Sequence, residues 1–181
     1  MHARWIAAIA LIATAMIGCT QSKTDWRQAV DEQLPMLGHR NWIVIADAAY
    51  PWQTAPGIET IYTGASQIEV VEVVLTATDQ APHVDPIIYV DNELRSVSDA
   101  DAPGIAAYRE SLNTLLGDRQ VNRLPHEDII AKLDEAGGTF RVLLLKTDMT
   151  LPYTSVFIEL YCGYWDRERE QRLRDAINAT P

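Results

Sequence analysis

The chain has 181 residues and a formal net charge of −10, from 15 Lys and Arg against 25 Asp and Glu. This length is typical of one domain, and a hydrophobic fraction of 48% indicates a folded core rather than a disordered chain. The acidic balance and the lack of a basic stripe argue against nucleic-acid binding and against electrostatic docking on an anionic membrane.

The first eighteen residues are typical of a targeting segment rather than of the folded domain. An almost wholly apolar run over residues 5–17 follows Arg4, and its length suits a secretory signal better than a membrane span. A small residue directly precedes Cys19, as in the lipoprotein cleavage motif of bacteria. We therefore predict a signal peptide over 1–18, lipidation of Cys19 and a polar tether over 19–24. The protein would be exported and lipid-anchored to a bacterial membrane in the cell envelope or periplasm; simple secretion and an uncleaved anchor are the alternatives.

The first half of the remaining chain begins with a helix and continues with strands. Asp25 is a suitable N-cap for a helix over residues 26–37. Residues 42–46 are five apolar residues between polar and turn residues, which predicts a buried strand. Residues 58–62 alternate and indicate a second strand. Residues 66–79 are ambiguous, because their valines favour a strand while their length and apolar spacing favour a helix.

The second half alternates strands and helices. Helices over residues 103–116 and 125–136 each begin at a proline and end before a glycine. A charged C-terminal helix is expected over residues 164–178. Three apolar segments are expected to form core strands: residues 86–90, 140–145 and 156–160. Strands that alternate with helices predict an α/β layered fold with a mostly parallel central sheet flanked by helices.

Two cysteines occur, Cys19 and Cys162. If Cys19 carries lipid, Cys162 is unpaired, and its place after an apolar strand indicates a buried, inert thiol. A Cys19–Cys162 disulfide is the alternative without lipidation. The sequence holds no clustered Cys and His pattern, so no metal site is predicted.

The strand over residues 42–46 has a base at one end and an acid at the other. Gly38 and His39 precede it, and Asp47 follows it. An imidazole and a carboxylate fixed on one rigid element are groups from which an acid–base site can be built. From the residues alone, a helix cap for His39 and a turn cap for Asp47 are the alternatives.

The order Leu-Gly-His39, a short apolar strand, Asp47-Ala and then Pro51 resembles the opening of the RbsD/FucU family, the D-ribose pyranases and L-fucose mutarotases. A second mark of that family, a Pro-Tyr step before the last core strand, is present at Tyr153. The resemblance implies an RbsD/FucU-like domain over residues 25–163, with a helix within it over the ambiguous segment. It leaves residues 164–181 as a C-terminal helical extension.

By this resemblance the protein is a mutarotase or pyranase that interconverts anomers or ring forms of a free monosaccharide such as ribose or fucose. One group removes the proton of the anomeric hydroxyl and another protonates the ring oxygen, which requires no cofactor and no metal. His39 matches the family's proton-donating histidine, Asp47 its sugar-binding carboxylate and Tyr153 its sugar-contacting tyrosine. The family forms rings with sites shared between subunits, so a homo-oligomer is expected.

Two departures from the family pattern affect the expected site. Ser155 stands where the family has Asn, and would contact the sugar through a single hydroxyl. The segment before Tyr153 is shorter than in the family, and Lys146 is the candidate for the basic residue that this segment usually carries. His126, at the start of a helix, has no motif context and is expected on the surface. These departures keep an alternative open: a catalytically inactive sugar-binding or structural lipoprotein module.

Overall fold

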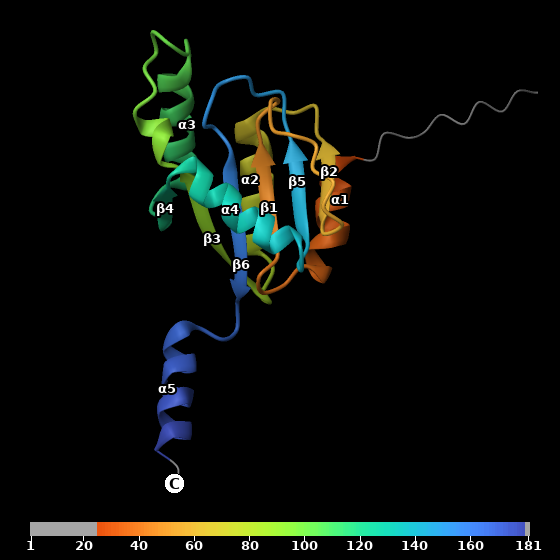
Figure 1. Cartoon of the computed structure of the whole chain (residues 1–181), viewed down its shortest axis with the longest axis vertical. Coiled ribbons are helices and arrows are strands. Elements are labelled where there is room, and N and C mark those ends of the chain that lie inside the picture. Colours follow the sequence, from red (N-terminus) through yellow and green to blue (C-terminus); the bar gives the residue numbers. More distant parts are fainter. Residues whose placement is uncertain (1–24, 180–181) are drawn as a thin grey trace, which may run out of the picture.

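A computed structural model describes residues 25–179 of the chain. A six-stranded sheet in the order β2-β5-β1-β6-β3-β4 forms its centre (Figure 1). The strands are β1 (Trp42–Ala46), β2 (Ile58–Tyr62), β3 (Val84–Asp91), β4 (Val121–Leu124), β5 (Val142–Lys146) and β6 (Val156–Cys162). Strands β2, β5 and β1 pair in parallel, as do β3 and β4, whereas β6 is antiparallel to both β1 and β3. Five strands therefore run in one direction and β6 alone runs in the other, which confirms the mostly parallel α/β fold.

Helices cover both faces of the sheet. They are α1 (Trp26–Gln33), the 3₁₀ turn η1 (Leu34–Met36), α2 (Gln67–Asp79), the 3₁₀ turn η2 (Asn92–Arg95), α3 (Ile105–Leu116), α4 (His126–Gly137) and α5 (Arg167–Asn178). Apolar residues of α1, α2 and α3 form one core cluster with Ile43 and Ile45 of β1. The other cluster joins α4 to Trp42 and Val44. All five residues of β1 are buried, so this strand is fixed by packing on both faces.

Local sequence signals explain where the first helices begin and end. Asp25 accepts a hydrogen bond from the Arg27 N–H, and Ser66 accepts one from the Glu69 N–H. The ambiguous segment is therefore a capped helix, α2, as the family resemblance implied. Helix α1 ends earlier than expected and continues as η1, which contains Pro35, because proline cannot supply the N–H that an α-helix requires.

Several elements differ from the sequence-based expectation. Strand β4 was not predicted, since its sequence Val-Asn-Arg-Leu is short and half polar, as an edge strand allows. The expected charged loop after β3 contains η2. Cys162 ends β6 and is half-buried rather than fully buried. Helix α5 has no buried residue and extends away from the sheet (Figure 1).

The predicted signal peptide, Cys19 and the tether over 19–24 lie outside the described residues. Within residues 25–179, no helix is both long and apolar enough to cross a membrane.

Candidate functional site

Polar side chains gather at the edge of the sheet where the five parallel strands end. Asp47 directly follows β1, Asp91 is the last residue of β3 and Lys146 is the last residue of β5. Because β6 runs the other way, it brings its beginning to the same edge, with Ser155 immediately before it. The carboxyl ends of parallel strands are where open α/β sheets bind ligands.

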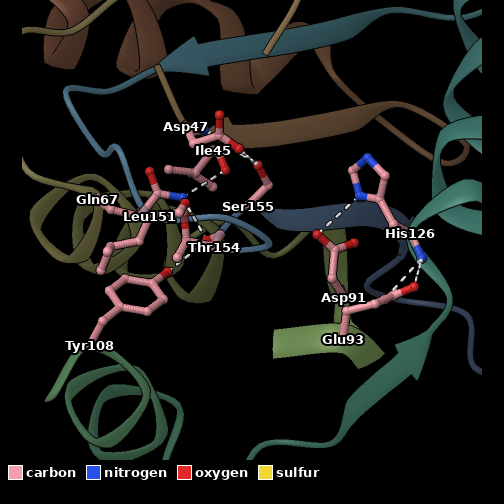
Figure 2. Close-up of polar contacts among 10 residues, drawn as sticks. All are labelled: Ile45, Asp47, Gln67, Asp91, Glu93, Tyr108, His126, Leu151, Thr154 and Ser155. Atoms are coloured by element: carbon pink, nitrogen blue, oxygen red, sulfur yellow. Dashed lines mark hydrogen bonds and ion pairs between the residues drawn. The ribbon is translucent and has the colours of Figure 1, made fainter. Parts of the chain in front are cut away.

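Asp47 and Ser155 form a hydrogen-bonded pair between the ends of β1 and β6. The Ser155 hydroxyl donates to Asp47 Oδ2 at 3.1 Å (Figure 2), and Asp47 Oδ1 accepts the Ala49 N–H at 2.9 Å. Ser155 is buried, so its hydroxyl orients the carboxylate rather than lying open to solvent. Each carboxylate oxygen keeps a further lone pair for a ligand hydroxyl.

Asp91 and His126 form a second acid–base pair at this edge. Asp91 Oδ2 lies 3.1 Å from His126 Nδ1 (Figure 2), and the carboxylate is only 1% exposed. Burial raises the pKa of Asp91 to about 6, although the adjacent His126 opposes this shift. The Glu93 carboxylate accepts the backbone N–H of His126 at 3.1 Å and so caps the first turn of α4.

Tyr153 flanks His126 and stands two residues before Ser155 in the chain. Its ring meets the His126 ring edge-to-face, with 5.7 Å between centroids, and 39% of the residue is exposed. The Tyr153 backbone has φ 58°, in the left-handed region that bulky residues rarely adopt. The next carbonyl, that of Thr154, is fixed by hydrogen bonds from the Tyr108 hydroxyl at 2.6 Å and from Gln67 Nε2 at 2.9 Å.

Gln67 supports the site through hydrogen bonds of its side-chain amide. It is fully buried at the start of α2, and its Nε2 also donates to the Ile45 carbonyl at 3.0 Å (Figure 2). Its Oε1 accepts the Thr147 hydroxyl. One amide side chain therefore ties together the end of β1, the residue after β5 and the entry into β6.

Lys146 lies beside this cluster, but its ammonium group is hydrogen-bonded to the loop after β1. Its Nζ donates to the Tyr50 carbonyl at 2.7 Å, and it stands opposite Ala46 in the β1–β5 register. The Tyr50 ring is buried, and burial raises the pKa of its hydroxyl to about 12. Lys146 thus holds the segment that follows Asp47.

His39 lies at the opposite edge of the sheet. Its exposed side chain packs edge-on against Tyr161, with 4.5 Å between ring centroids. The next residue, Arg40, donates its N–H to the Leu160 carbonyl of β6. Leu160 lies five residue steps along β6 from Ser155, or about 16 Å at the usual rise of a strand. Within one chain the structure therefore brings together Asp47, Tyr153, Ser155 and Lys146, but not His39.

Asp91 and His126 were missed by the sequence reasoning. His126 reaches the surface only in part, since its side chain is 31% exposed, and its contact with Asp91 was not expected. A usable signal existed for Asp91, because it follows an apolar strand just as Asp47 does. His126 had no such signal, since its role depends on how α4 begins beside β3.

The described residues include other histidines and carboxylates, but residues 25–179 hold no group of three or more His, Cys, Asp or Glu placed to bind a metal ion. The second unassigned histidine, His83, has Nε2 3.1 Å from the carbonyls of both Leu34 and Leu37. Two acceptors at one nitrogen require Nε2 to carry the proton, so His83 is a structural cap for the end of η1.

Comparison with known proteins gives matches in structure only. No protein-family model matches the sequence, and no curated protein does. RbsD from Bacillus subtilis, solved in complex with D-ribose, is similar with a TM-score of 0.52 at 18% identity, over 74% of this chain and 91% of that one. The fucose mutarotase from Streptococcus pneumoniae, solved in complex with L-fucose, has a TM-score of 0.50 at 20% identity, over 78% of this chain and 97% of that one. The resemblance seen around His39 and Tyr153 is thereby confirmed for the fold: the chain has the α/β fold of the RbsD/FucU proteins.

Proposed function

We propose that the protein interconverts the anomers or ring forms of a free monosaccharide by acid–base catalysis. The observation that carries this proposal is the gathering of Asp47, Tyr153 and His126 at the carboxyl edge of the sheet. The shared fold supports it, since the two similar structures hold D-ribose and L-fucose. A carboxylate, a phenol and an imidazole are the groups that recognise hydroxyls and move protons between them.

The reaction requires two proton transfers. One group removes the proton of the anomeric hydroxyl while another protonates the ring oxygen, so that the bond between the anomeric carbon and the ring oxygen breaks. The open-chain aldehyde rotates and closes again on its other face or through another hydroxyl. Each positioned proton-transfer group contributes typically 10²–10⁴-fold to the rate. In this scheme His126 exchanges one proton, and Asp47 holds a sugar hydroxyl.

The second proton-transfer group would be His39 of another copy of the chain. His39 is exposed, and it lies at the other end of β1 from Asp47, beyond a stretch of β6 about 16 Å long between Leu160 and Ser155. A homo-oligomer in which one copy presents its His39 edge to the carboxyl edge of the next would complete the site. Such sharing matches the assembly that the family resemblance implies.

Saturation-transfer NMR on ribose, fucose and related sugars tests the proposal. The protein should speed exchange between the anomeric signals, and Asp47→Ala should bring the exchange close to the uncatalysed rate. His83→Asn is the matched control, because His83 only caps η1 carbonyls, and it should leave the exchange unchanged. Sugar binding by calorimetry without exchange would point instead to an inactive binding module. A protein that neither binds nor exchanges any sugar of a broad panel would overturn the proposal.

We also propose that the protein acts outside the cytoplasm on a lipid anchor at Cys19. This part rests on the sequence of the first nineteen residues. Cys19→Ser should release the protein from the membrane fraction of the producing cell. Equal membrane association of the variant and the unaltered protein would contradict the anchor.

A further inference from the structure

We propose that Asp91 is a positioning residue that fixes the His126 ring with its Nδ1 proton toward Asp91, and so leaves Nε2 free to take and return a substrate proton. This inference rests on the proposed function for its catalytic half. Its structural half concerns the resting protein and can be tested without any sugar.

The enclosure of Asp91 is the first argument. The residue is 1% exposed, and among the described residues neither of its carboxylate oxygens has a regular hydrogen-bond donor. The close polar contact that remains is His126 Nδ1, at 3.1 Å from Oδ2, and this nitrogen likewise has no regular hydrogen-bond partner among the described residues. A carboxylate withdrawn from water without donors is costly to the fold, and groups of this kind cluster at functional sites, where they act on a partner.

The surroundings of His126 are the second argument. Its backbone is fixed by the Glu93 carboxylate, which accepts its N–H, and its ring is flanked by Tyr153. An ionised Asp91 can only accept a hydrogen bond, so its position favours the neutral ring that carries the proton on Nδ1 and leaves Nε2 as the basic nitrogen. Figure 2 shows Nδ1 turned toward Asp91 and the second ring nitrogen pointing away from it.

The charges around the pair set its pH range. The carboxylates of Glu93 on η2 and Asp47 after β1 both raise the pKa of Asp91, burial raises it most, and His126 on α4 is the group that lowers it. The phenols of Tyr50 and Tyr108 also lie within its electrostatic reach, and burial raises the pKa of both, so they stay neutral. Since the pKa of Asp91 is about 6, the carboxylate that orients His126 is lost below that pH. Catalysis through this pair should therefore fall on the acid side of about pH 6.

The test compares the ring nitrogens of His126 by ¹⁵N NMR in the unaltered protein and in Asp91→Asn. We expect Nδ1 to carry the proton in the unaltered protein. An Asn amide can donate to Nδ1, so the variant should shift the population toward the form protonated at Nε2. Glu93→Gln, which removes a nearby charge and keeps the acceptor for the His126 N–H, should leave the tautomer unchanged. His83, whose Nε2 faces two carbonyls, is the internal reference.

The kinetic part of the test separates positioning from structural support. In Asp91→Asn we expect kcat for anomer exchange to fall about 10²-fold with little change in KM, and the acid limb near pH 6 to disappear. An unchanged His126 tautomer would overturn the positioning role, and an unchanged kcat with an altered tautomer would overturn the proton transfer at Nε2.

Failure of the proposed function and failure of the variant to fold can each be distinguished from failure of this inference. If the unaltered protein exchanges no sugar, the proposed function fails, and with it the catalytic half of this inference, while the tautomer measurement still decides the positioning half. If Asp91→Asn does not fold, the ¹⁵N spectrum of the unaltered protein decides the positioning half alone: a neutral His126 ring protonated at Nε2 rather than at Nδ1 would overturn the inference.

Discussion

His39 and Asp47 lie at opposite ends of β1 and face different edges of the sheet. His39 packs against Tyr161 near the end of β6, while Asp47 is hydrogen-bonded to Ser155 just before β6 begins. The rigid strand between them is buried along its whole length. A single copy therefore cannot bring both side chains to one sugar ring, and the proposed catalysis requires two copies.

Mixing two inactive variants should restore activity. His39→Ala and Asp47→Ala are each expected to lack exchange. A hetero-oligomer prepared by co-expression contains junctions in which the intact His39 of one variant meets the intact Asp47 of the other. Anomer exchange by NMR should then recover to a fraction of the unaltered rate. Co-expression of two differently tagged Asp47→Ala chains is the control and should stay inactive, and a mixture no better than its parents would contradict the shared site.

Replacing Gln67 should destabilise the protein although the residue lies outside the proposed chemistry. Gln67→Leu removes the donors to the Ile45 and Thr154 carbonyls and the acceptor for the Thr147 hydroxyl. Each lost bond costs about 1 kcal/mol, and buried groups left unpaired cost more, so we expect a loss of about 2–4 kcal/mol in urea unfolding.

The matched control for that change is Gln28→Ala. Gln28 is exposed on α1, and its side-chain amide donates a hydrogen bond to the Glu32 carboxylate. Its replacement should alter the free energy of unfolding by less than about 0.5 kcal/mol. Equal effects of the two substitutions would contradict the bridging role of Gln67.

Asp91 should make the unaltered protein less stable as pH rises. Its pKa is about 6 in the folded state against 3.8 ordinarily, so between these values the folded state keeps a proton that the unfolded chain has released. Rising pH then favours unfolding, and the shift corresponds to about 3 kcal/mol. In Asp91→Asn the side chain has no titrating proton, so this contribution to the pH dependence of stability is absent. The stability of the unaltered protein relative to the variant should therefore fall between pH 4 and pH 7 in urea titrations, and a rise would show that the fold lowers the pKa of Asp91 instead of raising it.

Removal of α5 should leave the domain intact. No residue of α5 is buried, so deletion of residues 167–181 should change the melting temperature by less than about 2 °C. The contrasting change is Gly163→Ala, because a Cβ there would lie 2.6 Å from the Val84 carbonyl oxygen and 2.7 Å from that of Pro82. Calorimetry should show clear destabilisation for the glycine variant. A large loss on deleting α5 would indicate that the helix packs against another copy.

The sequence predicts the elements whose signals are local. The apolar run of β1, the Asp25 cap of α1 and Pro125 at the start of α4 each specify their element through neighbouring residues. The antiparallel direction of β6 and the existence of β4 depend instead on pairing with distant strands. A four-residue edge strand with two polar members carries too little periodicity to be recognised alone.

The same division holds for the site. Asp47 and Tyr153 were identified because each lies in a short motif. The Asp91–His126 contact joins residues from β3 and α4 that no local pattern relates, so only the packing of α4 against the sheet reveals it. The separation of His39 from Asp47 was implicit in the strand between them, since about 3.3 Å per residue places any two groups at its ends far apart.

The left-handed backbone at Tyr153 has a consequence for how this protein would respond to selection. A glycine adopts φ 58° freely, whereas a tyrosine there costs the fold about 1 kcal/mol. Tyr153→Gly would therefore relieve strain while removing the ring that flanks His126. A laboratory screen that selects for heat tolerance alone should replace Tyr153 early, and the tyrosine would be kept only where the screen also selects for catalytic activity.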